Sequence, residues 1–458
     1  MSEDSTRQGV LFEGLFGRPL RVRFDQPASS SDGGAVLLSA LDRRLRLSSA
    51  LASRLTDSRQ AAKVRHSLWD LMRQRVYGLA CGYEDCNDSA RLRGDPVHKL
   101  LLGRDPIQGE DLASQATLSR FENSLERRAL LGLGEAFAEA MVAHHRRRLG
   151  AGVRRVTIDL DVTDDPTHGS QQGSLFNGHY REHCLLPLAG FVQFGEEREH
   201  HLVALVLRPG NADARKGAVG LLRRLFRLLR KTFPKATLRV RLDGGFNGPK
   251  LLAFLERQGV EYVIGLPGNK VLERAAEPYM AEARHLAMDS GRGERVYGEA
   301  GYRAGSWRRY RRVIIKAEVT RYGQRPLRDN DRYLVTNLTE DPESVYAGSY
   351  CPRGEIENRL KELQYGLKLD RLSCHAFTAN QFRLLLTACA YALLQELRLQ
   401  AAGTAAARWQ VSTLRERLLK LGAWLQASTR RLTLHLPRDA PWQAEWRRAA
   451  ASLGALPP

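Results

Sequence analysis

The sequence predicts a mixed α/β fold in which helices flank a sheet, and three observations support this prediction. Helical periodicity dominates residues 1–150 and returns after residue 346. Between these regions, β-branched runs alternate with amphipathic helical segments, which is typical of a mixed sheet covered by helices. Residues 269–345, a basic segment of β character, interrupt this alternation. We therefore expect a core with a β-rich insertion, enclosed by helical N-terminal and C-terminal regions.

The N-terminal region, residues 1–150, is expected to be mainly helical. It starts with a short strand, Arg18–Phe24, and a loop, Ala28–Gly34. Apolar residues at helical spacing then predict helices in AVLLSALDRRL, SLWDLMRQRVYGLA and ALLGLGEAFAEAMVAHHRRRLG. The basic run His144–Arg148 before Gly150 suits a helix C-terminus, and it suits contact with DNA equally well.

The core is expected in two parts, residues 151–268 and 346–395. The first part predicts three strands, a helix, a strand, a helix and a strand. The strands are RRVTIDLDV, HCLLPLAGFVQF, His200–Gly210, TLRVRLDGGFN and Val260–Gly268, and the helices lie at about 212–233 and in GPKLLAFLERQG. The second part predicts a helix at about 352–367 and an apolar helix, NQFRLLLTACAYALLQELRLQ. Residues 396–458 predict a basic helical tail.

The composition points to an anionic partner. Lys and Arg number 71 against 51 Asp and Glu, for a formal charge of +20. Such an excess indicates nucleic acid more often than an anionic membrane surface. No apolar run approaches the roughly 20 residues of a membrane span, and the polar start, MSEDSTRQG, does not suit a secretory signal.

The six cysteines are scattered along the chain, which fits a reducing cytoplasm better than a disulfide framework. Cys81 and Cys86 are separated by four residues, but no second Cys/His pair follows at zinc spacing. We therefore expect these thiols to be buried or inert.

Three acids are candidates for a metal site in this basic chain. Asp161 closes the strand in VTIDLDVTDDPTHG, Asp243 closes another strand before two glycines, and Glu357 lies on the later helix. Strand-end carboxylates can converge at one edge of a sheet, where oxygen ligands suit Mg²⁺. Two such ions about 4 Å apart can drive phosphoryl transfer. The simpler alternative is that these aspartates serve turns or helix caps.

The helix over 350–368 bears on this choice. Its polar residues recur every three or four positions and share one face: Tyr350, Arg353, Glu357, Lys361, Gln364 and Lys368. An acid flanked by cations one turn away on each side can be a surface salt-bridge ladder. The same arrangement also suits one metal ligand surrounded by groups that bind DNA phosphates.

Together these motifs resemble the DDE transposases of bacterial insertion sequences, in the branch with a Tyr-x2-Arg-x3-Glu-x6-Lys signature. Tyr350, Arg353 and Glu357 match the signature, while Gln364 stands at its final basic position. The segment DLDVTDDPTHGSQQGSLFNGHY is similar to the family's first-aspartate segment, and RLDGGFN to its second. We assign Asp161 as the first acid because of its Asp-x-Thr context, with Asp159 as the fallback.

The resemblance implies an RNase H-like core interrupted by the insertion, and a catalytic triad of Asp161, Asp243 and Glu357 that binds two Mg²⁺ ions, for which Mn²⁺ can substitute. It implies a homodimer on paired terminal inverted repeats, cut-and-paste excision, and joining of 3′-hydroxyls to double-stranded target DNA in the bacterial cytoplasm, associated with the nucleoid. Residues assigned to DNA contact are Tyr350, Arg353, Lys361 and Lys368 for phosphates and Trp307 for base stacking, with residues 1–150 as the default DNA-binding region. The alternatives are an inactive DNA-binding or regulatory descendant, or a structure-specific nuclease without strand transfer.

Overall fold

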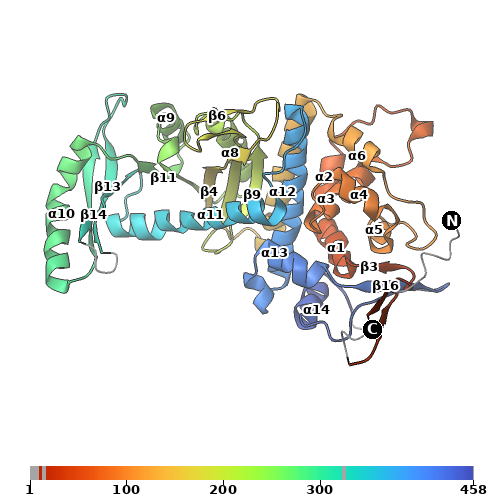
Figure 1. Ribbon diagram of the computed structural model, residues 1–458. Coiled ribbons are helices and arrows are strands. Elements are labelled where there is room, and N and C mark those ends of the chain that lie inside the picture. The colour runs from red at the N-terminus through yellow and green to blue at the C-terminus, as the bar shows by residue number, and fades with distance from the viewer. Residues whose placement is uncertain (1–9, 13–16, 322–325, 457–458) are drawn as a thin grey trace.

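The computed structural model describes residues 10–12, 17–321 and 326–456. The molecule is elongated, with a central sheet between a helical N-terminal region and the insertion (Figure 1). The long helix α12 (Phe377–Gln400) lies between the sheet and most of the N-terminal helices. In the part of the chain that the structure describes, no helix is both long and apolar enough to cross a membrane.

Five strands of the central sheet lie in the order β9-β8-β4-β10-β11. Their bounds are β4 Arg155–Val162, β8 Leu188–Phe194, β9 His201–Val206, β10 Thr237–Leu242 and β11 Glu261–Leu266. The first three along the chain pair antiparallel, whereas β10 runs parallel to both β4 and β11. All five strands were predicted. They are buried on both faces, which explains their continuous apolar, β-branched runs.

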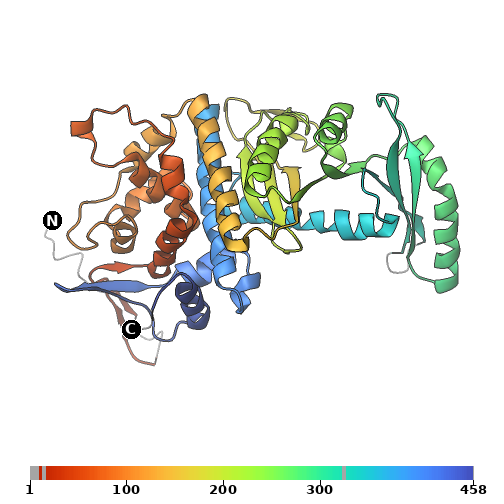
Figure 2. The ribbon, with the colours of Figure 1, turned by 180° about the vertical axis from the view of Figure 1, so that it is seen from behind.

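Helices cover the sheet and fix its faces. The helix α8 (Ala218–Thr232) buries Leu222, Leu225 and Leu229 at helical spacing, and α9 (Pro249–Arg257) precedes β11. The helices α7 (Arg127–Leu149) and α12 lie side by side and both pack against β9 (Figure 2). Nearly every residue of α12 is buried, as expected for a helix that is apolar all round.

In its described residues, the N-terminal region contains the three predicted helices and four more. Those predicted correspond to α1 (Val36–Leu45), α3 (Leu68–Ala80) and α7. The others are α2 (Leu47–Ala52), α4 (Cys86–Arg91), α5 (Pro96–Leu101) and α6 (Gln115–Glu122). They are short, so periodicity alone gave little signal, and capping aspartates set two of them: Asp85 caps α4 and Asp95 caps α5.

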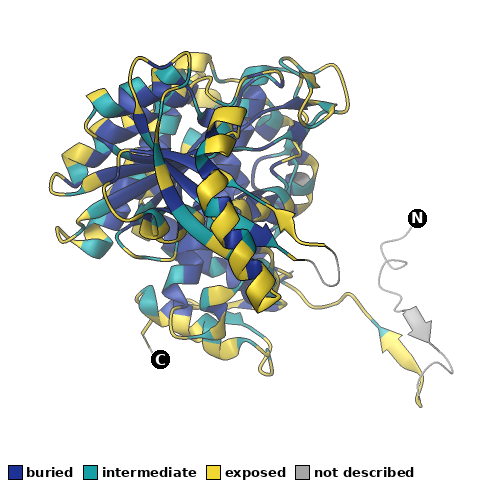
Figure 3. Ribbon diagram, turned by 90° about the vertical axis from the view of Figure 1, so that its left-hand side faces the viewer, coloured by how far each residue is buried: buried dark blue, intermediate teal, exposed yellow. Residues whose placement is uncertain are grey.

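The insertion, predicted to be β-rich, begins with a long helix that the sequence analysis did not predict, α10 (Lys270–Ser290). Its inner residues Leu272, Ala276, Met280, Ala283 and Ala287 are buried. The outer face of α10 is exposed (Figure 3). The following strands are β12 (Glu294–Tyr302), β13 (Arg311–Thr320), β14 (Arg328–Asp329) and β15 (Arg332–Thr336). Since β15 pairs with β11, the insertion extends the central sheet.

The C-terminal tail also departs from the helical prediction. It holds a hairpin, β16 (Ala423–Ala427) and β17 (Leu432–His435), before the last helix, α14 (Gln443–Ser452). β16 pairs with β3 (Ser29–Ser30), so residues near both ends of the chain form one small sheet.

Candidate active site

Two neighbouring strands bring the two predicted aspartates to one edge of the sheet. β4 and β10 are parallel, with Asp159 opposite Arg241. Asp161 and Asp243 each follow two residues later and therefore lie beside one another where the strands end. Asp161 is buried, at 8% exposed, whereas the Asp243 side chain is 40% exposed. The Asp243 carboxylate accepts a hydrogen bond from the Gly245 amide at 2.9 Å, which fixes the turn after β10.

Arg353 places its guanidinium between these two carboxylates. One terminal nitrogen lies 2.9 Å from Asp161 Oδ2 and 3.6 Å from Asp243 Oδ2. Burial alone lowers the pKa of Arg353, but Asp161 and Asp243 hold it above its ordinary value. Its Nε is buried without a hydrogen-bond partner among the described residues. The site thus already contains one internal cation at the position where two acids converge.

The electrostatics of Asp161 reflect all three acids. Burial raises the pKa of its carboxyl to about 6, and the guanidinium of Arg353 opposes this rise. The negative charges of Asp243 and Glu357 raise the same pKa further. A divalent cation at Asp161 therefore has to compete with a proton that the raised pKa of this carboxyl retains below about pH 6. Glu357 therefore belongs to the same electrostatic environment as the two aspartates.

Glu357 lies on α11 (Gly354–Lys361), one turn after Arg353, and it is exposed. No hydrogen bond or ion pair with a described residue engages its carboxylate. The three acids do not form a single tight ligand cluster: among the described residues, only Asp32, Cys81 and His98 bring three ligand atoms within 4.8 Å of one another. The spacing of the three acids is therefore wider than that of three ligands on a single ion.

Several buried contacts hold the helix that carries Glu357. Arg241, on β10, donates to the Ser349 carbonyl at 3.2 Å, just before this helix. At the other end, Glu362 accepts hydrogen bonds from Tyr391 at 2.8 Å and from Arg398, both on α12. Figure 1 shows α11 running along the core toward α12. The position of Glu357 is therefore set by the sheet at one end and by α12 at the other.

Gln364 joins the two halves of the site directly. Its side-chain amide donates to Thr163 Oγ1 at 2.5 Å, immediately after β4. A neutral amide thus links the helix that carries Glu357 to the strand that carries Asp161. This amide stands at the position where the family signature has a basic residue, Lys. The helix changes to π-helical geometry from Glu362 to Gly366, which turns Gln364 toward the strand.

Tyr350 approaches the site beside Gly265, whose missing side chain leaves room for the tyrosine hydroxyl. A Cβ on Gly265, in β11, would lie 3.1 Å from the Tyr350 hydroxyl and 2.7 Å from the Gly244 backbone nitrogen. Both distances are too short for an ordinary contact, so residue 265 must lack a side chain. Gly265 thereby allows both the Tyr350 hydroxyl and the turn after Asp243 to pack close against β11.

Asp159, the fallback for the first acid, has a different environment. Its carboxylate is fully buried, and the Arg241 guanidinium donates to both oxygens at 2.8 Å. Such a bidentate ion pair leaves little capacity for a metal ion. Geometry therefore favours Asp161 over Asp159.

The remaining predicted residues lie apart from this centre. Lys361 is exposed on α11. Lys368 does not continue the polar face as expected, because the helix ends at Gly366 and Lys368 has a positive φ of 50°. Trp307 is only 5% exposed and packs edge-on against Tyr302, with the Arg311 guanidinium 4.9 Å from its ring.

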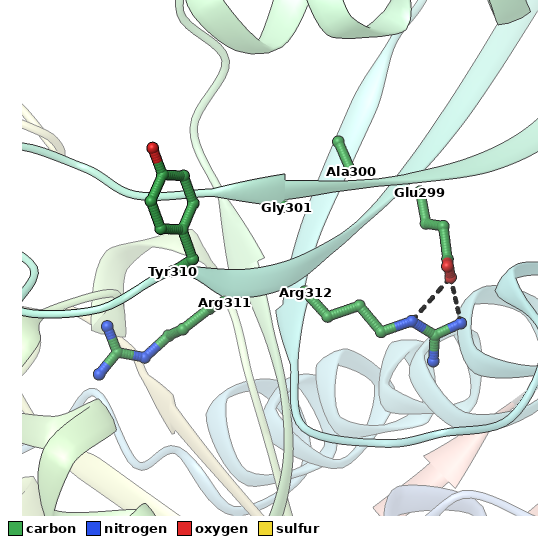
Figure 4. Close-up of a pocket in the computed structure, with 6 residues that line it drawn as sticks. All are labelled: Glu299, Ala300, Gly301, Tyr310, Arg311 and Arg312. Carbon is green, nitrogen blue, oxygen red and sulfur yellow. Dashed lines mark hydrogen bonds and ion pairs between the residues drawn. The ribbon is translucent and has the colours of Figure 1, made fainter.

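The exposed aromatic side chain in this part of the insertion is Tyr310, at 69% exposed. Figure 4 shows it at the start of β13, where Arg312 pairs with Glu299 of β12 at 2.7 Å. Sequence reasoning missed Tyr310, and it also missed Arg241. The signal for Arg241 was present: an arginine at an inward position of a buried strand requires a buried acid.

A family model decides the classification. The model for the transposase DDE domain group 1 matches residues 12–458, nearly the whole chain. The chain belongs to this family of DDE transposases. Among curated proteins, none matches it significantly. The chain is thus a transposase of a mobile genetic element and acts on DNA. Members of its family generally use divalent metal ions.

Proposed function

We propose that this transposase excises its element by cut-and-paste, cleaving the terminal inverted repeats and joining the freed 3′-hydroxyls to target DNA. The observation that carries the proposal is the convergence of Asp161 and Asp243 on Arg353, one helical turn from Glu357. The strand order β9-β8-β4-β10-β11 supports an RNase H-like core, in which catalytic acids lie at such strand ends.

The residues fit Mg²⁺. The donor set consists of carboxylates, which this hard cation prefers. The Arg353 guanidinium already bridges two of them, so the position suits a positive charge. Asp161, Asp243 and Glu357 would hold two ions, with Mn²⁺ able to substitute. When bound, the ions polarise the scissile phosphodiester and stabilise the leaving oxygen.

The protein's own residues position the DNA and neutralise its charge. Arg353, once released from the aspartates, can donate to a phosphate beside the scissile bond. Tyr350 presents its hydroxyl at the same edge, and the exposed Lys361 lies one turn beyond Glu357 on α11. Gln364 keeps the strand end and the helix together without adding charge. Stacking of Trp307 on a base requires this side chain to leave its contacts with Tyr302 and Arg311.

A basic pocket supports binding of DNA across the core and the insertion. It has a volume of about 700 Å³ and lies between α8, α9 and the loop joining β12 to β13. Its cationic lining residues are Arg223, Lys250, Arg257, Arg308, Arg309 and Arg311, of which Arg309 and Arg311 pair with Glu256 in the same lining. Such a concentration of guanidinium and ammonium groups suits the phosphates of a DNA end, and we expect binding to weaken steeply with salt. Synapsis of two ends would use a homodimer.

Cleavage of the element's own terminal repeats tests the proposal. Asp243→Asn and Glu357→Gln should each abolish Mg²⁺-dependent cleavage while DNA binding stays nearly intact, because neither change removes a cation. Full cleavage by both variants would contradict the proposal. Hydrolysis without joined products would indicate a nuclease, and absence of any nicking by the unmodified protein would indicate an inactive descendant.

A further inference from the structure

A second cluster of metal-ligating side chains lies far from the catalytic acids. Asp32 precedes α1, Cys81 follows α3, and His98 belongs to α5. One ligand atom from each lies within 4.8 Å of the others. All three side chains are buried, with exposed fractions of 0%, 0% and 1%. Three segments distant in sequence thus bring sulfur, nitrogen and oxygen donors to one buried point.

We propose that Asp32, Cys81 and His98 form a structural site for a borderline-soft divalent cation, Zn²⁺ being the best match. A thiolate, an imidazole and a carboxylate are the ligands that Zn²⁺ takes in proteins, whereas Mg²⁺ takes oxygen ligands. The site is therefore chemically distinct from the all-carboxylate catalytic centre. This inference does not depend on the proposed function.

The contacts at the cluster suit a metal ligand set. His98 Nε2 lies 2.8 Å from Asp32 Oδ2, a hydrogen-bond distance. A metal ion bound by both atoms would replace the proton that they share. The other carboxylate oxygen, Oδ1, lies 2.8 Å from the Lys420 ammonium. Lys420 thus orients the carboxylate from outside the ligand set, as outer partners of metal ligands do.

The surroundings indicate what such an ion would stabilise. Asp32 follows β3, which pairs with β16 of the C-terminal tail, and Lys420 lies just before β16. A Cβ on Gly34 would lie 1.7 Å from the Leu418 carbonyl oxygen, so the loop after Asp32 is packed tightly on the tail. The site lies where the N-terminal loop, the helices α3 and α5 and the C-terminal tail meet. A bound ion would therefore link the loop after β3, and through it the C-terminal tail, to the helices α3 and α5.

Cobalt spectroscopy on the full-length protein tests the site. We use the Asp161→Asn, Asp243→Asn double variant as background, so that the catalytic acids do not contribute. Metal-free protein titrated with Co²⁺ should develop a near-ultraviolet thiolate-to-cobalt band at one ion per chain, and Zn²⁺ should remove it. Cys81→Ser should lose the band, and His98→Gln should weaken Co²⁺ binding at least tenfold. The matched control is Cys389→Ser, a buried thiol in α12, which should keep the band.

A stability measurement covers the case in which Cys81→Ser does not fold. Micromolar Zn²⁺ should raise the melting temperature of the metal-free background protein, and the same concentration of Mg²⁺ should not. Absence of the band in the background protein, or its persistence in Cys81→Ser, overturns the proposal. An equal response of the melting temperature to both ions also overturns it.

Discussion

Replacement of Arg353 by alanine should strengthen metal binding while it destabilises the metal-free protein. Arg353 is the internal cation between Asp161 and Asp243, so an incoming divalent ion has to displace it. A guanidinium about 4 Å from a carboxylate attracts it by about 4 kcal/mol at an effective dielectric constant of about 20. Solvent reduces this value at Asp243, whose side chain is 40% exposed. If only about 1.4 kcal/mol survives, Mn²⁺ affinity rises about tenfold in Arg353→Ala.

The assay is Mn²⁺ binding without DNA, followed by electron paramagnetic resonance or calorimetry. Arg353→Lys is the matched control, since it keeps the charge and should bind Mn²⁺ much as the unmodified protein does. Without metal, Arg353→Ala leaves Asp161 buried and unpaired, which should lower the free energy of unfolding by about 3 kcal/mol. Unchanged or weaker Mn²⁺ binding in Arg353→Ala would refute the view that Arg353 holds the place of the metal.

Three further predictions follow from the same structure. Because burial raises the pKa of Asp161 to about 6, a proton competes with Mn²⁺ for this carboxylate, and Mn²⁺ affinity should fall about tenfold per pH unit below pH 6. Calorimetry at pH 4.5–8 measures this dependence, and a flat profile would show that Asp161 is not a ligand. Asp165 is fully buried, neither oxygen has a hydrogen-bond partner among the described residues, and burial with the charge of Asp370 raises its pKa to about 8. Ionisation of Asp165 then favours the unfolded chain, so the free energy of unfolding falls between pH 4 and 8. Asp165→Asn should raise the melting temperature at pH 8 and lose this advantage near pH 4. An effect of the substitution that does not change with pH would contradict the reasoning. Gly265→Ala should lower stability by about 1–3 kcal/mol and disturb cleavage, since its Cβ would lie 2.7 Å from the Gly244 nitrogen, while Gly301→Ala, with nothing within 4 Å, should leave both unchanged.

The sequence predicted the strands of the core and the order of its acids, because each depends on local pattern. β-branched runs ended at Asp161 and Asp243, and these ends became neighbours once β4 and β10 paired in parallel. The helix α10 was missed because Pro278 stands inside it, and an internal proline usually ends a helix. In the structure this helix continues to Gly291, whose left-handed conformation closes it.

Contacts between distant segments could not be predicted in the same way. Nothing near Arg353 in the sequence indicates that its guanidinium reaches two aspartates more than 100 residues earlier. The role of Gln364 was equally hidden, because its partner Thr163 comes within reach only after the π-helical turn from Glu362 to Gly366. The buried cluster of Asp32, Cys81 and His98 has no regular spacing in the sequence, so no zinc-binding motif indicates it.

Anomalous diffraction from a crystal of the protein with Mn²⁺ and a terminal-repeat DNA end tests the central claim most directly. The account predicts manganese peaks within coordination distance of carboxylate oxygens of Asp161 and Asp243, with Glu357 on one of the ions and Arg353 turned away toward a phosphate. Manganese bound elsewhere, with Arg353 still between the two aspartates, would contradict it.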